Sequence, residues 1–104
     1  MEIKQEKNGS KLLLSLIGRL DTITAPQLDA VIKNDLAGIT DLTIDLAQLE
    51  YVSSAGLRML LTAQKLMNKQ GSMVLCNVCQ DVMEVFNITG FADILNIKYH
   101  TCIS

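Results

Sequence analysis

Short apolar runs alternate with polar, glycine-containing segments along the chain, and the spacing within each run predicts a strand or a helix. Leu12–Ile17 and Met73–Cys76 are almost continuously apolar, which is typical of strands inside a sheet. Between the first two predicted strands, Asn8-Gly9 favours the positive φ angles of a hairpin turn. The sequence predicts strands over residues 2–6, 12–17, 42–46 and 73–76, with Gly18 ending the second and a last strand from Ile97 to Tyr99.

Apolar residues at helical spacing mark three further segments. The first starts at Thr24-Ala25-Pro26-Gln27, where threonine three positions before glutamine predicts a capping box and proline suits the first turn. Single glycines follow the apolar stripes, as they do at helix ends. The predicted helices are a first one closed by Gly38, a second over residues 55–69 closed by Gly71, and a short third one capped by Asp81 with Glu84 and stopped near Gly90.

The order of these elements predicts an α/β fold. A hairpin feeds strand–helix–strand crossovers, and such crossovers join parallel strands. We therefore expect a mixed, mostly parallel sheet of four to five strands, packed by about three to four helices. The continuous apolar strands predict that this sheet is largely covered.

Composition places the chain among small cytoplasmic proteins. Its 104 residues, 49% of them hydrophobic, predict one domain over residues 1–104. A net charge of −2 argues against nucleic acid as a partner. The amino terminus is charged from Glu2 onward, and no apolar stretch is long enough to cross a bilayer, so we expect neither a signal peptide nor membrane insertion. Three cysteines fit a reducing cytosol better than a disulfide scaffold.

Catalytic and metal chemistry find little support in the sequence. His100 is the single histidine. Asp21 and Asp45 could be named as catalytic bases, but no catalytic motif accompanies either of them. Cys76 and Cys79 form a C-x-x-C pair, but no thioredoxin-like context surrounds it, and core packing explains Cys76 better. A zinc site made of Cys76, Cys79, His100 and Cys102 would have an unrecognised spacing. The sequence predicts a protein that is not an enzyme and holds neither a metal nor a cofactor.

Chemistry concentrates instead in Tyr51–Leu57, where Ser53 and Ser54 stand between an apolar strand and an amphipathic helix. A serine at this point is a preferred helix cap. A phosphate at the same point would be favoured by the unpaired first-turn amides and by the helix dipole. The residues themselves leave both interpretations open.

The whole chain resembles the STAS domain family, in particular stand-alone bacterial anti-sigma factor antagonists. Ser53-Ser54-Ala55-Gly56-Leu57, with its upstream apolar strand, is the most specific match. The other matching segments are Gly18–Thr22, Asp45–Val52, Gly71–Val78 and Phe86–Phe91.

This resemblance implies a partner switch. The unphosphorylated antagonist binds an anti-sigma factor that is also a serine kinase, and phosphorylation of the antagonist ends the association. A PP2C-type phosphatase restores it. On this chain the resemblance implies that Ser54 is the phosphate acceptor. Many members have aspartate just before the acceptor, but this chain has a second serine at that position, so Ser53 is the alternative acceptor. It implies a docking surface made of Asp21, Thr22, Ser53, Gly56 and Arg58.

Structural roles compete with these assignments. Asp21 and Thr22 equally fit a turn that leads into the first helix. Gly56 has no side chain near the serine, which could allow a kinase to approach or allow close packing. Some STAS domains act as accessory or scaffold subunits of transporters or signalling complexes, without phosphorylation, and this is the alternative function.

Overall fold

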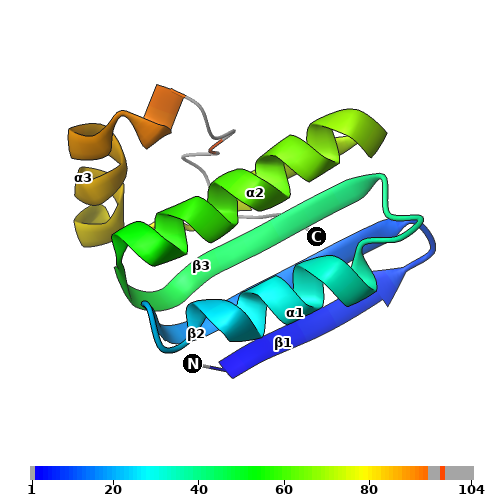
Figure 1. The fold of residues 1–104 in the computed structure, drawn as a ribbon, viewed down its shortest axis with the longest axis horizontal. Helices are drawn as coiled ribbons and strands as arrows, with labels where there is room; N and C mark the ends of the chain where they lie inside the picture. The colour runs from blue at the N-terminus through cyan, green and yellow to red at the C-terminus, as the bar shows by residue number, and fades with distance from the viewer. Residues whose placement is uncertain (1, 94–96, 98–104) are drawn as a thin grey trace.

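Four strands and three helices make up the computed structural model, which describes residues 2–93 and 97 (Figure 1). The sheet has the order β1-β2-β3-β4, in which β1 and β2 are antiparallel and the other pairs are parallel. The chain order is β1 (Glu2–Asn8), β2 (Lys11–Leu20), α1 (Ala25–Asp35), β3 (Asp41–Val52), α2 (Ser54–Gln70), β4 (Ser72–Cys76), α3 (Gln80–Thr89) and a 3₁₀ turn (Phe91–Asp93). The predicted α/β class, with a mixed, mostly parallel sheet, is confirmed.

The second strand extends past the glycine that was expected to end it. Gly18 has a φ of 103°, which lies in the region that favours glycine, and the pairing with β3 shifts register between Gly18 and Arg19. The extra residue of this bulge is Glu50 on β3, opposite the step from Gly18 to Arg19, and β2 continues to Leu20. Of the predicted last strand, Ile97 forms a parallel bridge with Leu75, while Tyr99 lies outside the described residues.

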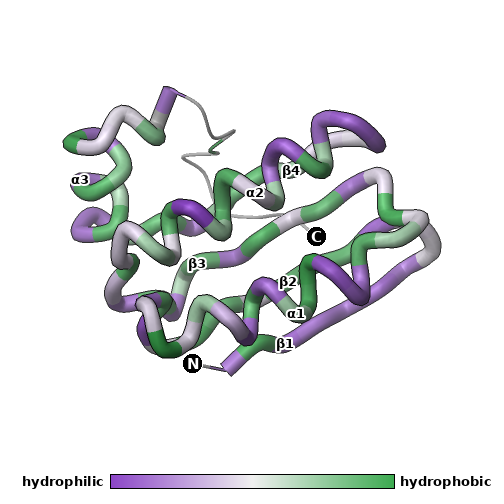
Figure 2. Tube along the Cα trace, viewed as in Figure 1, coloured by the Kyte–Doolittle hydropathy of each residue, from purple (hydrophilic) through white to green (hydrophobic). Residues whose placement is uncertain are grey.

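The two faces of the sheet differ more than the continuous apolar runs predict. One face, formed by alternate residues such as Leu14 on β2 and Ile44 on β3, is fully buried and joins the buried side chains of all three helices in one core. On the other face, Leu13, Ile17 and Val74 are half-buried and lie outside that core. Figure 2 shows the edge strand β1 as largely hydrophilic, which is typical of an edge that discourages pairing with other chains.

Two helices begin differently from the predictions. Thr24 precedes α1 but makes no capping hydrogen bond from its side chain, because the turn before it is held by Asp21 instead. Helix α3 begins at Gln80 after Cys79, so Asp81 lies inside its first turn rather than at the cap.

Two of the predicted helix ends are confirmed: Gly71 is the C-cap of α2, and Gly90, with a left-handed φ of 81°, is the C-cap of α3. The prediction that Gly38 closes the first helix is wrong, because α1 ends at Asp35 and Leu36 is its C-cap.

Candidate functional site

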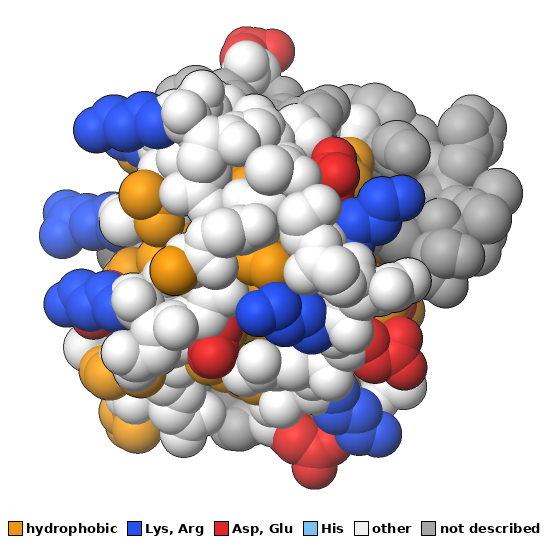
Figure 3. Space-filling model, turned by 90° about the vertical axis from the view of Figure 1, so that its right-hand side faces the viewer, with side chains coloured by type: hydrophobic (Ala, Val, Ile, Leu, Met, Phe, Trp, Pro, Cys, Tyr) orange, Lys and Arg blue, Asp and Glu red, His pale blue; other side chains and the backbone are white. Residues whose placement is uncertain are grey.

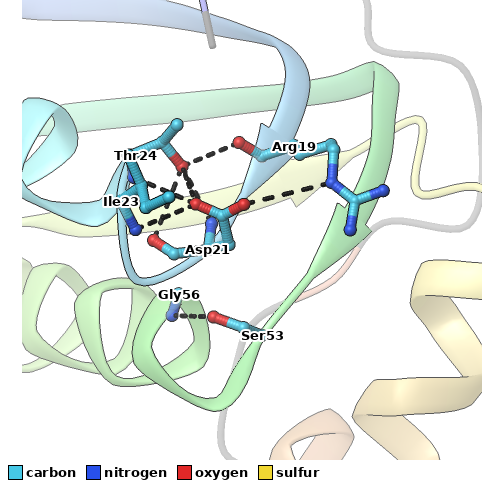
Figure 4. Close-up of polar contacts among 6 residues, drawn as sticks. All are labelled: Arg19, Asp21, Ile23, Thr24, Ser53 and Gly56. Carbon is cyan, nitrogen blue, oxygen red and sulfur yellow. Dashed lines mark hydrogen bonds and ion pairs between the residues drawn. The ribbon is translucent and has the colours of Figure 1, made fainter.

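The site lies at the edge of the sheet where β2 and β3 end side by side. Their last residues, Leu20 and Val52, are partners in the parallel pairing. One residue further on, the Ser53 amide donates to the Leu20 carbonyl oxygen at 2.8 Å. The loop after β2 therefore lies beside the start of α2, at the left of Figure 1 and in close-up in Figure 4.

The two serines have different environments. Ser53 has extended backbone angles (φ −94°, ψ 175°), and its Oγ accepts from the Gly56 amide at 3.3 Å while its carbonyl accepts from the Leu57 amide at 2.9 Å. Ser53 is thus the half-buried N-cap of α2. Ser54 is the first residue of the helix, is exposed, and forms no side-chain hydrogen bond with any described residue. Its hydroxyl can be reached from solvent.

The loop beside α2 is a turn built around Asp21. Its Oδ1 accepts from the amides of Ile23 and Thr24 at 3.0 and 3.1 Å, and its own amide donates to Thr24 Oγ1 at 2.8 Å. Thr24 Oγ1 in turn donates to the Arg19 carbonyl at 2.7 Å (Figure 4). The Thr24 amide is the main reason that the pKa of Asp21 lies below its ordinary value. Asp21 is therefore a rigidly held negative charge next to the start of α2.

Two residues of this region were not among the predicted site residues. Ile23, at the tip of the Asp21 turn, exposes 85% of its surface, and Tyr51, near the end of β3, exposes 41%. The Arg19 guanidinium lies 4.5 Å from the centre of the Tyr51 ring, and Arg19 Nε lies 3.9 Å from Asp21 Oδ2. Ile23 is an isolated apolar residue between Thr22 and Thr24 in the sequence, and that isolation was the available signal for an exposed apolar side chain.

Gly56 and Arg58 occupy opposite sides of the first turns of α2. Gly56 is buried, and a Cβ placed on it would lie 2.7 Å from Leu20 Cγ, 2.8 Å from Leu20 O and 2.9 Å from Val52 Cγ2. Close packing against the ends of β2 and β3 therefore requires glycine there. Arg58 is exposed, as the helical spacing predicts.

The other chemical candidates have structural roles. Asp45 Oδ1 accepts from the Ala47 amide at 2.9 Å and from Asn77 Nδ2 at 3.2 Å, so it fastens an irregular stretch of β3. Cys76 is buried, and the Cys79 thiol faces the Leu49 carbonyl at 3.5 Å. Within residues 2–93 and 97, no group of three or more His, Cys, Asp and Glu residues could hold a metal ion. His100 and Cys102 lie outside the described residues.

Two other parts of the surface formed by residues 2–93 and 97 lack such a cluster of polar contacts. A shallow hollow of about 220 Å³ on the second sheet face is lined by Lys4, Ser15, Leu16, Ile17, Asp45, Ala47 and Gln48. Figure 3 views the end of the molecule opposite to the start of α2, where basic and acidic side chains are intermixed. Of the helices described, none combines the length and apolarity needed to span a bilayer.

Comparison with known proteins identifies relatives along nearly the whole chain. The STAS domain profile matches residues 2–101. BtrV of Bordetella bronchiseptica, described as an anti-sigma factor antagonist, is 37% identical over 99 residues, which cover 93% of this chain and 85% of BtrV. The anti-sigma-B factor antagonist of Bacillus subtilis is 31% identical over 99 residues, which cover 94% of this chain and 89% of that protein.

Solved structures of the Bacillus protein SpoIIAA share the fold. The unphosphorylated form, an anti-sigma factor antagonist, superposes with a TM-score of 0.75 and 18% identity over 96% of this chain and 90% of its own. The phosphorylated form superposes with a TM-score of 0.65 and 16% identity over 95% and 93%. SpoIIAA therefore keeps this fold in both states.

Proposed function

Because this chain belongs to the STAS domain family, we propose that it is an anti-sigma factor antagonist whose binding to a kinase-type anti-sigma factor is ended by phosphorylation of Ser54. One observation carries the proposal. Ser54 is exposed at the first position of α2, while the neighbouring Ser53 supplies the helix cap. The chain would act as a binding regulator and not as an enzyme, and a PP2C-type phosphatase would reset it.

The start of α2 suits a covalently attached phosphate. Among the first-turn amides, those of Gly56 and Leu57 are satisfied by Ser53, while the amides of Ser54 and Ala55 meet no acceptor among the described residues. Unpaired amides and the helix dipole favour an anion there by about 0.3–2 kcal/mol. Phosphorylation should therefore leave the fold of the free protein nearly unchanged.

A bound partner would experience the same phosphate very differently. We assign the docking surface to Asp21, Thr22, Ile23, Ser53, Ser54 and Arg58, with Gly56 packed beneath them. Inside such an interface the phosphate loses water, and an unpaired buried charge costs about 2–5 kcal/mol. Affinity would fall by roughly two to three orders of magnitude, because about 1.4 kcal/mol is tenfold. Asp21 adds repulsion of like sign.

Matched alanine variants of the two serines test the assignment. Ser54→Ala should bind the cognate anti-sigma factor, keep its stability and resist labelling by that kinase with ATP. Ser53→Ala removes the cap, so we expect it to lose about 0.5–2 kcal/mol of stability and still be labelled. Labelling that persists in Ser54→Ala and disappears in Ser53→Ala would move the acceptor to Ser53. If the native protein and both variants bind the anti-sigma factor and none of them is labelled, the result would favour the accessory-subunit function.

A charge mimic tests the switch itself. Ser54→Asp should weaken binding to the anti-sigma factor far more than it changes the melting temperature. A large fall in melting temperature with intact affinity would contradict the electrostatic account.

A further inference from the structure

The two exposed residues Ser54 and Arg58 lie four positions apart on α2. We propose that Arg58 is the intramolecular partner of the phosphate on Ser54, so that phosphorylation closes an arginine–phosphoserine pair along the first turn of this helix. The inference rests on the proposed phosphorylation of Ser54. It adds the residue of this chain that pairs with the negative charge of the phosphate.

Helix geometry brings the two side chains together. Residues four apart are neighbours on one helix face, with Cβ atoms about 5–6 Å apart. Long side chains on a helix lean toward its amino terminus, so the Arg58 guanidinium can reach back to the turn that begins with Ser54. A guanidinium is planar and carries donors in a fork, which allows two parallel hydrogen bonds to a phosphate.

Arg58 is available for this role, whereas the other arginine is not. No described residue forms an ion pair with Arg58, and α2 contains no aspartate or glutamate that could compete for it. Arg19 is already engaged, because it pairs with Asp21 and lies over Tyr51. Asp21, in the loop beside the start of α2, has its Oδ1 occupied by two amides and its Oδ2 paired with Arg19. The phosphate would therefore meet one uncommitted arginine.

Pairing changes two charges on the docking surface at once. Phosphorylation adds a group carrying nearly two negative charges, of which one guanidinium balances only one, so an unpaired charge still has to be desolvated in the interface. The pair also engages a cation that the unphosphorylated surface leaves free for an acidic partner. Arg58 thereby couples the modification to the surface that the partner meets.

The pair can be tested on protein that carries phosphoserine at position 54 by translational incorporation, without any kinase. A ³¹P NMR pH titration compares the native sequence with Arg58→Gln and with the control Lys65→Gln. Lys65 is exposed on the same helix but lies 11 residues from Ser54, about 16 Å along the axis and beyond the screening length at physiological salt. Each variant is checked for the native circular dichroism spectrum.

A neighbouring cation favours the doubly charged phosphate and so lowers the pKa of its second ionisation. We expect this pKa to be lower in the native sequence and in Lys65→Gln than in Arg58→Gln, with partial recovery in Arg58→Lys. Phosphorylation should also raise the melting temperature more in the native sequence than in Arg58→Gln. Equal pKa values in all variants would overturn the pair. Because no kinase is used, this failure is distinct from a failure of Ser54 to be labelled.

Discussion

Replacing Gly56 with alanine should damage the junction between α2 and the strand ends. The added Cβ would lie 2.7 Å from Leu20 Cγ and 2.8 Å from the Leu20 carbonyl oxygen, closer than such atoms normally approach. Overpacking of this kind costs about 1–3 kcal/mol. In a domain of this size, each kcal/mol corresponds to roughly 4–8 °C, so the melting temperature should fall by roughly 4–24 °C.

The consequence extends to the site, because the crowded Leu20 oxygen also accepts from the Ser53 amide at 2.8 Å. Thermal and urea unfolding monitored by circular dichroism give the stability, and hydrogen exchange at the Ser53 amide should be faster in Gly56→Ala. Ser54→Ala, two positions earlier on the exposed side of the helix, is the control and should stay within about 0.5 kcal/mol of the native protein. A Gly56→Ala protein as stable as the native one, with unchanged exchange at Ser53, would refute this account of the packing.

Two further predictions concern the loop beside α2. The pKa of Asp21 is below its ordinary value of 3.8, so its charge stabilises the fold above that pH, and this contribution disappears as pH falls through the lowered pKa. The stability difference between the native protein and Asp21→Asn should therefore be larger at pH 7 than at pH 2 in urea unfolding; a difference independent of pH would contradict it. Ile23→Ser should weaken anti-sigma factor binding without loss of stability, because the Ile23 side chain is 85% exposed, and calorimetric titration showing unchanged affinity would remove Ile23 from the docking surface.

Much of the fold could be predicted because its periodicities are local. The apolar runs located β2, β3 and β4, and the Asn8-Gly9 turn signal located the hairpin that contains β1. Helical spacing places Leu57, Leu60, Leu61 and Met67 on one stripe of α2; three of them are buried and Leu61 is half-buried, while Arg58, off that stripe, is exposed. Gly18 was misinterpreted for a physical reason. A glycine inside a strand can mark either its end or a bulge, and only the register of the neighbouring strand decides between them.

The caps were harder to predict than the helices they precede. Thr24 followed by Gln27 matches a capping box, yet Thr24 Oγ1 donates to the Arg19 carbonyl, and Asp21 accepts the amides of the turn. A hydroxyl or carboxylate within a few residues of a helix start has several possible backbone partners. The choice among them depends on where the preceding strand leaves the sheet, which no local pattern contains.

The same dependence decides which serine is the cap. β3 ends at Val52 because that residue pairs with Leu20, and the next amide is held by the Leu20 carbonyl, so Ser53 has extended angles and α2 begins at Ser54. Had the helix begun one residue later, Ser54 would have been the cap, and its oxygen would already have been engaged by an amide of the first turn. In the observed arrangement the capping oxygen and the exposed oxygen belong to different residues, so a phosphate on Ser54 would leave the Ser53 cap in place. Strand pairing produces this division between adjacent serines because it fixes where the helix starts.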